Sequence, residues 1–368
     1  MIVFAHLLND RSGSTRVLKT VVELIGTPSS DILYVGGGSD GLLGGGPGVE
    51  IRHYWYRRSS VRIVTLLTYL FSQLLLFVRL LCDRRIERDA LIYINTLMPF
   101  GAALFGWLTG RPVVYHLHEV SISPAPLRAL LVTIARLTST RLIYVSDAHR
   151  AMLPIADDLA TVIHNALDPA FLAAGLGADS REQPFNVVML SYNRAYKGVP
   201  EFIALADRLS ARQDIRFHLV LSDSADGLAA APRLANLTIH PPSDHPETFY
   251  RRAGAVLNLS RPDLCVETFG LTLLEAMAFG VPVIAPPVGG PAELIRDGCE
   301  GYLIDSRDGR ALAEAVERLA DNDATYHSMS LAARARAEQF DAPRFRAALS
   351  DVIDAAKATR EHLGKALS

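Results

Sequence analysis

Short apolar runs and longer amphipathic runs alternate along the whole chain. The short runs lie between turn-forming residues and predict buried β-strands, whereas apolar residues that recur every three or four positions predict helices. In the first half, strands are expected at Ile2–Ala5, Ile32–Val35, Ile51–Trp55, Leu91–Ile94, Val113–His116, Leu142–Val145 and Val162–His164. In the second half, they are expected at Val187–Leu190, Phe217–Leu221, Leu237–His240, Ala255–Leu259 and Val283–Ala285.

Helical runs connect these strands, and the alternation predicts an α/β protein with mainly parallel sheets. In the first half the helices lie near Thr15–Ile25, Val61–Leu81, Pro99–Leu108, Leu127–Leu137 and Ala148–Leu153. In the second half they lie near Pro200–Ala211, Pro246–Arg252, Leu271–Phe279, Ala292–Ile295, Ala311–Ala320, Ala324–Gln339 and Ala342–Ala358.

The length of 368 residues favours two domains. The stretch from Asp168 to Pro184 is rich in Gly, Ala, Asp and Pro and has no strand pattern, so we interpret it as a linker. We expect a Rossmann-like domain over 1–170, a second one over 185–340 and a final helical segment over 341–368. If the two domains face one another, the carboxyl ends of both sheets meet at a shared cleft.

Composition narrows the class of protein. Hydrophobic residues make up 49% and charged residues 21%, as in folded globular proteins, and a net charge of −2 argues against nucleic acid as the main partner. The three cysteines, Cys82, Cys265 and Cys299, have neither metal nor disulfide spacing, which favours a reducing compartment. No secretory pattern follows Met1, so we expect a cytoplasmic protein.

One helical run raises the question of a membrane. Ile63–Val78 is largely apolar, but Arg62 and Arg79 bracket only 16 residues, fewer than the roughly 20 that span a bilayer. One interpretation buries the apolar face against the protein's own sheet. The other docks this helix on an anionic leaflet, because basic and aromatic residues surround it. They are Trp55, Tyr56, Arg57, Arg58, Arg62, Arg84, Arg85 and Arg88.

The stretch from Val266 to Gly280 carries the clearest chemical signal. A predicted strand precedes it, and its good helix formers begin at Leu271 and end at Gly280. A strand, a loop and a helix in this order place backbone N–H groups and a positive helix end at the sheet edge where phosphates bind. Glu267 falls on the loop, and Glu275 falls one turn into the helix, within reach of a sugar hydroxyl.

This stretch resembles a known family. The pattern E-x-F-G-L-x-x-x-E-A-M-A-x-G-x-P-V-I-A from Glu267, with Gly289–Ile295 and Asp297-Gly298 after it, is similar to the donor-site signature of retaining nucleotide-sugar glycosyltransferases of family four, including members from bacterial polysaccharide biosynthesis. The resemblance implies the GT-B fold, with a C-terminal helix that crosses back to the first domain. The alternative is that Glu275 is an ordinary helix-surface residue and Glu267 an ordinary loop acid.

The loop after the first strand of the second half adds two cations. Lys197-Gly198 matches the K-G of the family, and Lys197 and Arg194 would bind the diphosphate. The resemblance departs at the arginine, which many members carry where this chain has Tyr192; a subgroup with L-R-x-Y-K-G spacing fits better. Arg194 is therefore either a ligand or a solvated surface residue.

Two regions of the first half also resemble family positions. His118, followed by Glu119, is similar to the family's His-acid pair, whose imidazole faces the donor sugar; His116 shares its side of the strand and is more often structural. Ser12, Gly13 and Ser14 replace a glycine-rich loop near the acceptor and the diphosphate, although Ser12 or Ser14 also suits a helix N-cap. Ser146 and Asn165 are interpreted as capping and turn residues.

We therefore predict a retaining, metal-independent hexosyltransferase that moves a sugar from a nucleotide diphosphate sugar to a glycan or lipid-linked acceptor in cell-surface polysaccharide synthesis. Backbone N–H groups of Phe269, Gly270 and Leu271 would hold the diphosphate, Glu275 the ribose, and Glu267 the donor sugar. No cofactor is expected. A nucleotide-sugar epimerase and a non-catalytic nucleotide-sugar-binding subunit stay open as alternatives, and so does peripheral binding to the inner face of a membrane.

Overall fold

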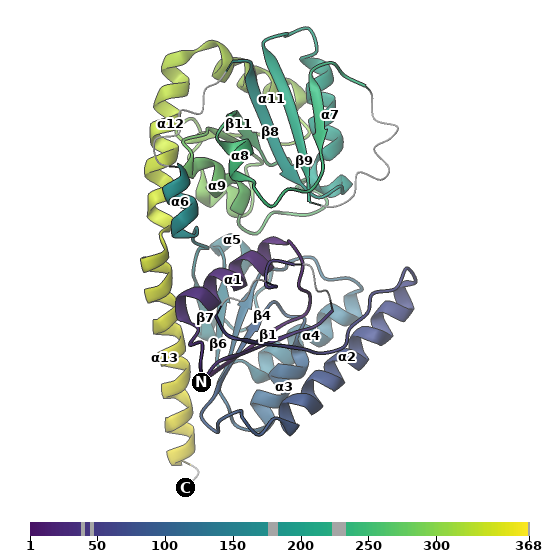
Figure 1. The fold of residues 1–368 in the computed structure, drawn as a ribbon, viewed down its shortest axis with the longest axis vertical. Coiled ribbons are helices and arrows are strands. Elements are labelled where there is room, and N and C mark those ends of the chain that lie inside the picture. The colour runs from purple at the N-terminus through teal and green to yellow at the C-terminus, as the bar shows by residue number, and fades with distance from the viewer. Residues whose placement is uncertain (38–40, 45–47, 176–182, 223–232, 367–368) are drawn as a thin grey trace. The chain divides into compact units, whose positions relative to one another are not determined.

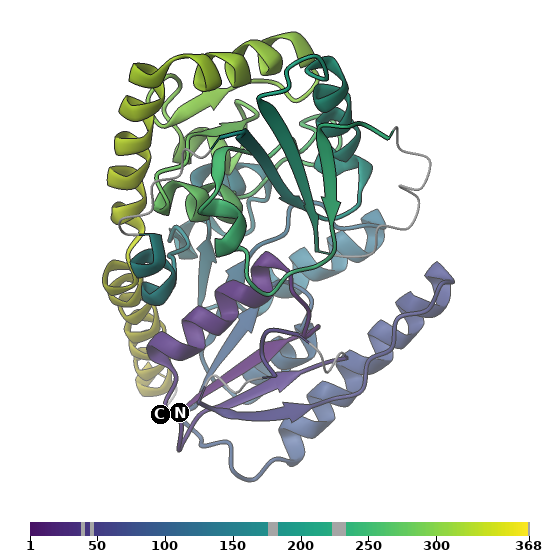
Figure 2. The same ribbon diagram turned by 45° about the horizontal axis from the view of Figure 1, so that its top comes forward.

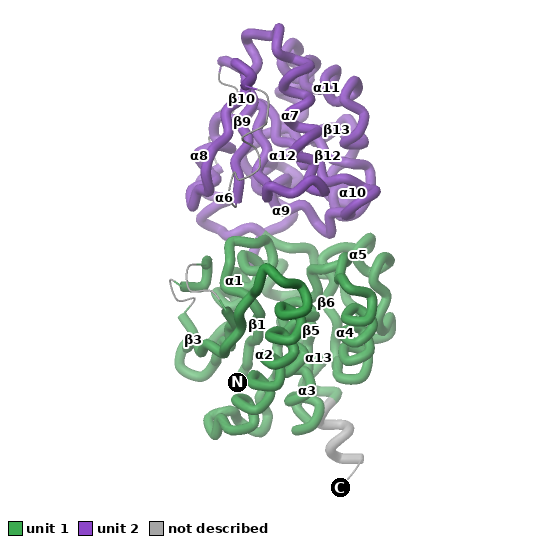
Figure 3. The backbone as a smooth tube through the Cα atoms, turned by 90° about the vertical axis from the view of Figure 1, so that its right-hand side faces the viewer, with its two compact units in different colours: residues 1–166, 343–368 green, residues 167–342 purple. Residues whose placement is uncertain are grey.

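The computed structural model describes residues 1–37, 41–44, 48–175, 183–222 and 233–366. The chain forms two compact units, shown in Figure 3. Unit 1 comprises Met1–Ala166 and Pro343–Ser368, and unit 2 comprises Leu167–Ala342. Each unit contains one parallel sheet, which confirms the predicted α/β class.

Unit 1 is built on a seven-stranded sheet in the order β3-β2-β1-β4-β5-β6-β7. The strands are β1 Ile2–His6, β2 Ile32–Val35, β3 Glu50–His53, β4 Leu91–Asn95, β5 Val113–Leu117, β6 Arg141–Tyr144 and β7 Ala160–Val162. Every neighbouring pair is parallel. The register places Asn95 of β4 beside His116 of β5, so polar groups from two strands meet near the carboxyl edge.

Helices cover both faces of this sheet (Figure 1). They are α1 Gly13–Ile25, α2 Arg62–Cys82, α3 Phe100–Leu108, α4 Ala125–Thr138 and α5 Asp147–Met152, with a short 3-10 turn η1 at Asp157–Leu159. The last helix, α13 at Ala342–Ala366, returns to unit 1, as expected of a C-terminal helix that crosses back. The Arg141 side chain donates to Thr359 Oγ1 of α13 at 3.1 Å.

Unit 2 has a six-stranded parallel sheet in the order β10-β9-β8-β11-β12-β13. The strands are β8 Phe185–Ser191, β9 Ile215–Leu221, β10 Leu237–His240, β11 Ala253–Leu257, β12 Val283–Ala285 and β13 Gly301–Leu303. The helices are α6 Pro169–Gly175, α7 Val199–Arg208, α8 Glu247–Tyr250, α9 Leu271–Ala278, α10 Gly290–Leu294, α11 Gly309–Asp321 and α12 Asp323–Ala337, with 3-10 turns η2 Ala195–Lys197 and η4 Glu338–Phe340.

The region interpreted as a linker contains a helix that the sequence analysis did not predict. Its described part begins with α6, which packs against α8 and α9 of unit 2. Phe171 of α6 contacts the rings of Tyr250 and Phe279 edge-on. Aromatic burial therefore attaches this segment to unit 2, although its Gly- and Ala-rich composition is typical of a connection.

The strand orders fix where ligands bind. In unit 2 the chain begins at β8, adds β9 and β10 on one side, and then crosses to β11 on the other side. The loops after β8 and β11 therefore leave the sheet in opposite directions at its carboxyl edge, the place where α/β sheets commonly bind ligands. In unit 1 the same reversal occurs at β1, between β2 and β4.

Helix α2 differs from its expected packing. At 21 residues it is longer than the apolar run between its arginines, and it is the one helix among the described residues that is long and apolar enough to cross a membrane. Only 28% of its most apolar stretch is buried. The interpretation that the helix packs on its own domain holds for one side, where Tyr69, Leu76 and Leu80 are buried in the core of unit 1. A second apolar side is exposed: Ile63 and Leu67 are 65% and 60% accessible.

Candidate functional site

The candidate site of unit 2 lies at the carboxyl ends of β8 and β11. Lys197 ends the turn η2 that follows β8, and Glu267 lies on the loop between β11 and α9. The Lys197 Nζ atom donates to Glu267 Oε2 at 2.8 Å, so the two residues meet although 70 positions separate them in the sequence. The structure thus brings together the two charged residues that the sequence analysis placed at the donor sugar and the diphosphate.

Two further side chains complete the environment of Glu267. Asn258 Nδ2 lies 3.4 Å and Ser260 Oγ 3.3 Å from Glu267 Oε2, and both can donate to it. The same carboxylate oxygen therefore accepts from Asn258, Ser260 and Lys197. The sequence analysis did not single out Asn258 or Ser260; the available signal was their position directly after the apolar strand β11.

Gly198 allows the loop that carries Lys197 to approach β11. Its backbone has φ +77°, and a Cβ atom at this position would lie 1.9 Å from the carbonyl oxygen of Leu259. Only glycine fits such an approach and such a dihedral angle. The two loops are also joined by a hydrogen bond from the Arg261 N–H to the Tyr196 carbonyl at 2.8 Å. In the Lys197-Gly198 pair, the glycine therefore allows the close approach that positions the ammonium group of the lysine.

The Lys197–Glu267 pair is charged. The Glu267 carboxylate raises the pKa of Lys197, and this effect exceeds the lowering caused by burial. Burial alone raises the pKa of Glu267, but Lys197 and the hydrogen bonds from Asn258 and Ser260 together hold that pKa below its usual value. The site therefore presents a fixed ammonium group beside a fixed carboxylate.

The loop that carries Glu267 leads directly into the N-terminus of α9. Gly270 has φ +97° and turns the chain into the helix at Leu271, while Phe269 is buried. The first N–H groups of a helix have no intrahelical acceptor and attract anions. Gly290 makes room for this loop, because a Cβ atom there would lie 2.3 Å from the Phe269 Cα.

Glu275 lies one turn into α9 and is buried, with only 2% of its surface accessible. Its Oε2 atom accepts a hydrogen bond from the Tyr250 hydroxyl at 2.7 Å. The alternative of an ordinary helix-surface glutamate is therefore wrong. A carboxylate is costly to bury without hydrogen-bond donors, so its presence here indicates a specific role in binding or packing.

Arg194 occupies a different environment. It lies at the start of η2, its side chain is exposed, and its Nη1 atom donates to the carbonyl of Asn193 at 2.8 Å. It thus shares the loop of Lys197, but its side chain is exposed whereas that of Lys197 is half-buried.

In unit 1, Asn95 forms hydrogen bonds with both regions that the sequence analysis assigned to the site, His118 and the loop with Ser14. His118 Nε2 lies 3.0 Å from Asn95 Oδ1, and Asn95 Nδ2 donates to the Ser14 carbonyl at 3.1 Å. Because an amide oxygen only accepts, Nε2 of His118 carries the hydrogen. Burial, followed by the neighbouring histidines, lowers the pKa of His118, so its ring is neutral near pH 7. Asn95 was missed, although it directly follows a predicted strand.

The loop of Ser12, Gly13 and Ser14 begins α1. Ser12 takes the N-cap position, but its hydroxyl does not cap the helix; it donates to Asp10 Oδ1 at 2.6 Å. The capping interpretation is therefore wrong for its side chain. Within 4 Å of a Cβ atom built on Gly13 there is nothing among the described residues, so this helix end is open to solvent.

Two expectations for structural residues are tested by the hydrogen bonds. Ser146 caps α5 by accepting from the His149 N–H at 3.0 Å, as predicted. His116 is buried, its Nδ1 atom forms a hydrogen bond with the Tyr93 hydroxyl at 2.8 Å, and its ring packs on His118 with centroids 4.5 Å apart. The two histidines therefore lie on one side of β5, as predicted, and His116 is part of the packing.

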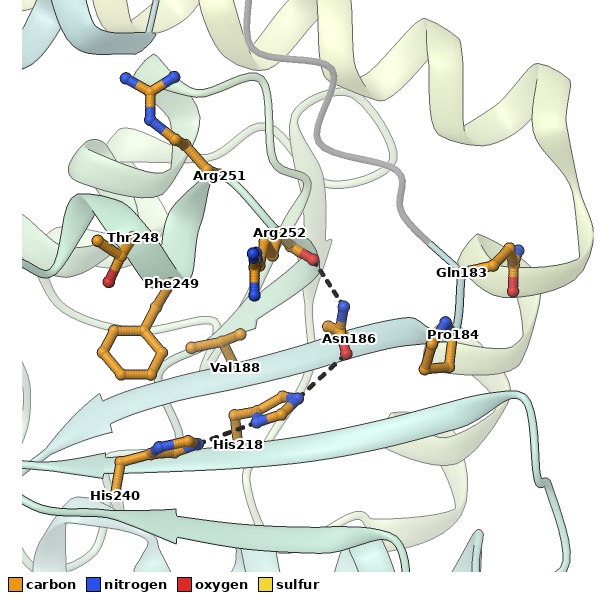
Figure 4. Close-up of a pocket in the computed structure, with 10 residues that line it drawn as sticks. All are labelled: Gln183, Pro184, Asn186, Val188, His218, His240, Thr248, Phe249, Arg251 and Arg252. Atoms are coloured by element: carbon orange, nitrogen blue, oxygen red, sulfur yellow. Dashed lines mark hydrogen bonds between the residues drawn. The ribbon is translucent and has the colours of Figure 1, made fainter.

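A hollow of about 740 Å³ lies elsewhere on unit 2, and no predicted site residue lines it. Figure 4 shows a chain of polar groups along its floor: His240 and His218 lie 3.0 Å apart, His218 contacts Asn186 Oδ1 at 3.1 Å, and Asn186 donates to the carbonyl of Arg252. Burial lowers the pKa of both histidines. These groups satisfy one another, so we do not assign the hollow to the candidate site.

Comparison with known proteins agrees with this geometry. Residues 178–336 match the family described as glycosyl transferases group 1, a range that includes every candidate residue of unit 2. A D-inositol 3-phosphate glycosyltransferase of Streptomyces griseus is 33% identical over 159 residues, which are 40% of this chain and 33% of that protein. The chain thus spans about a third of the length of that curated relative.

Solved structures resemble the whole chain. HepE of Anabaena, in complex with UDP and glucose, has a TM-score of 0.76 at 20% identity and covers 96% of this chain and 99% of its own. Sucrose-phosphate synthase of Thermosynechococcus elongatus has a TM-score of 0.75 at 16% identity, with 97% and 99% covered. The fold is therefore that of the GT-B glycosyltransferases, as the resemblance implied.

Proposed function

We propose that this protein is a retaining glycosyltransferase that uses a nucleotide diphosphate sugar. The observation that carries the proposal is the half-buried Lys197–Glu267 pair beside the N-terminus of α9, at the carboxyl ends of β8 and β11. This arrangement supplies a cation and the N–H groups of a helix N-terminus for a diphosphate, and a carboxylate for the neighbouring sugar. The family match over 178–336 supports the same activity.

The diphosphate is held by Lys197 and by the N–H groups at Phe269, Gly270 and Leu271. An ammonium group has three donors, so Lys197 can keep its bond to Glu267 while it binds a phosphate oxygen. The positive end of α9 stabilises the charge that develops on the departing diphosphate. Because these groups supply the positive charge, we propose that no metal is required, and activity should persist with a chelator present.

Glu267 orients the donor sugar and does not attack it. Three donors stabilise its charged form, and a carboxylate stabilised in this way is a weaker nucleophile. Retention then follows from attack of the acceptor on the face that the diphosphate leaves, with the departing phosphate as the base. His118, Ser12, Gly13 and Ser14 are proposed to contribute from unit 1 to sugar and acceptor binding.

The donor is proposed to be a UDP-hexose, because HepE, which has the same fold, is described with UDP and glucose. The acceptor is proposed to be a glycan or a lipid-linked glycan at the cytoplasmic face of a membrane. A thermal-shift screen of nucleotide sugars tests the donor, since a ligand raises stability by RT ln(1 + [L]/Kd). Incubation of the stabilising nucleotide sugar without acceptor must give no new sugar isomer; an isomer would identify an epimerase instead.

Glu275 is expected to bind the ribose hydroxyls of the donor. Glu275→Gln should weaken UDP binding about ten- to a hundredfold, because a hydrogen bond to a charged group is worth roughly 1.5–3 kcal/mol. Tyr250→Phe removes the donor that holds Glu275 Oε2 and should weaken binding less. Calorimetric titration with UDP measures the affinities of both variants, and Glu314→Gln on the surface of α11 is the control. Equal binding by wild type and Glu275→Ala would show that the ribose assignment is wrong.

A further inference from the structure

Helix α2 buries one side, which carries Tyr69, Leu76 and Leu80 as well as two polar residues, and leaves a second, apolar side exposed. Ser72 and Gln73 are fully buried, and Gln73 Oε1 accepts from the Gly101 N–H of α3 at 3.2 Å. Gly101 allows this close packing, because a Cβ atom there would lie 2.2 Å from the Gln73 carbonyl oxygen. The polar stripe is therefore fixed against α3, and the opposite side of the helix faces outward.

The outward side is a continuous apolar surface. It consists of Ile63, Leu67, Leu70, Phe71, Leu74, Val78 and Leu81, which we call the apolar face of α2. These positions recur every three or four residues and extend over roughly 27 Å of helix. Trp55 adds to the face, since its half-exposed ring lies edge-on to the Phe71 ring, with the two ring centroids 5.9 Å apart. Water-soluble surfaces rarely expose an apolar patch of this kind without a partner.

Figures 1 and 2 show α2 along the outer edge of unit 1, where one end of it projects beyond the neighbouring elements. Among the elements of unit 1 its principal packing partner is α3, which contacts the opposite, buried side of the helix. The apolar face is therefore accessible to a flat surface.

The charges around the apolar face of α2 indicate which kind of partner binds it. Residues 51–82 include five arginines and no aspartate or glutamate, and four of these arginines stay after Arg52 is paired with the flanking Glu50 and Asp83. Arg57, Arg58 and Arg62 are exposed at the N-terminal end of the helix. The loop that carries Arg57 and Arg58 is fixed to α2, because the Thr68 hydroxyl donates to the Arg57 carbonyl at 2.8 Å and Thr65 bonds to Ser59. A basic rim beside an apolar face matches an anionic lipid leaflet.

Two other arrangements fit less well. A spanning α2 would have to carry β4 away from β3, yet both strands belong to one sheet. A second copy packed face to face would bring like charges together, because Arg62 and Arg79 lie at opposite ends of the helix and Arg84 follows it.

We propose that the apolar face of α2 and its arginine rim dock unit 1 on the surface of an anionic membrane, with α2 parallel to the bilayer plane. This docking would bring a lipid-linked acceptor to the enzyme, a consequence that rests on the proposed function, whereas docking itself rests on α2 alone.

Vesicle flotation tests the proposal with the full-length protein. We expect it to float with vesicles of phosphatidylcholine and about 30 mol% phosphatidylglycerol at about 0.05 M salt, and to be released at about 0.5 M salt. Arg57→Glu/Arg58→Glu/Arg62→Glu should weaken partitioning about a hundredfold. Leu67→Ser/Phe71→Ser/Leu74→Ser should abolish it. Matched controls in unit 2, Arg310→Glu and Leu331→Ser, change exposed residues of the same kinds and should float like wild type.

Circular dichroism and UDP binding by unit 2 show whether each variant is folded. Failure of wild type to float at low salt, or equal flotation of the apolar-face variant, would overturn the proposal. A dimer that light scattering detects and that the apolar-face variant disrupts, without vesicle binding, would assign the face to a second copy. If the protein floats but transfers no sugar, the proposed function fails and docking stands.

Discussion

Replacing Lys197 by alanine is expected to lower turnover about ten- to a hundredfold while the protein stays folded. The ammonium group binds the diphosphate, and a hydrogen bond to a charged group is worth roughly 1.5–3 kcal/mol. The effect extends to Glu267, because Lys197 is the cation that holds the pKa of this half-buried carboxylate down. Without it, burial should raise that pKa, and activity should fall further as the pH is lowered.

A double-mutant cycle separates these two roles. Lys197→Ala and Glu267→Gln should each lower turnover, and the double variant should lose less than the sum, because the two side chains interact at 2.8 Å. Lys19→Ala, in an exposed ion pair on α1, is the matched control. Steady-state kinetics at saturating donor measure the turnover of wild type, of both single variants and of the double variant. Unchanged kinetics of Lys197→Ala would remove Lys197 from the site, and additive losses would show that the pair does not act as a unit.

The alternating pattern was sufficient to predict most of the fold. Every strand expected from a run of apolar residues is present, with ends shifted by no more than two residues. Among the described residues, one α-helix and one strand were missed, α6 and β13. Strand β13 is short and begins at Gly301, where a Cβ atom would lie 1.8 Å from the Val283 carbonyl oxygen. A glycine required by such close strand packing resembles a turn residue in the sequence.

The charged site residues could be predicted, but their supporting residues could not. Glu267, Glu275 and Lys197 stand in recognisable motifs. Asn258 and Tyr250 do not, because their roles depend on where β11 and α8 place them relative to the carboxylates. A single polar residue after a strand is common, and only the fold shows which one reaches the site.

Helix α2 shows the limit of periodicity most clearly. The sequence contains two faces, one with Tyr69 and Ser72 and one with Leu67 and Phe71, and the hydrophobic effect predicts that the second is buried. The structure buries the first. The hydrogen bond of Gln73 to Gly101 and that of the Tyr69 hydroxyl to the Met98 carbonyl at 2.7 Å fix this choice. Such partners come from distant residues and leave no periodic signal.

Acid is expected to destabilise unit 1 through its buried histidines. Burial, with a smaller effect of His149, lowers the pKa of His116 from 6.5 to about 3. Below about pH 6.5 His116 therefore becomes protonated in the unfolded chain while it stays neutral in the folded protein. Its contribution to the free energy of unfolding is complete at neutral pH and decreases as the pH falls. Between about pH 7.5 and pH 5 this residue alone should cost about 2 kcal/mol of unfolding free energy. The pKa values of His6 and His118 are lowered too, which adds to the loss.

Urea unfolding followed by tryptophan fluorescence measures this effect in unit 1, because Trp55 and Trp107, the two tryptophans of the chain, both lie there. His116→Gln keeps a hydrogen-bond partner for the Tyr93 hydroxyl but does not titrate, so its loss of unfolding free energy between the two pH values should be smaller than that of wild type by about 2 kcal/mol. His53→Gln, with an exposed ring, should retain the full wild-type loss. If His116→Gln shows the same pH dependence as wild type, the destabilisation comes from other groups, and the buried imidazole of His116 takes up its proton without unfolding unit 1.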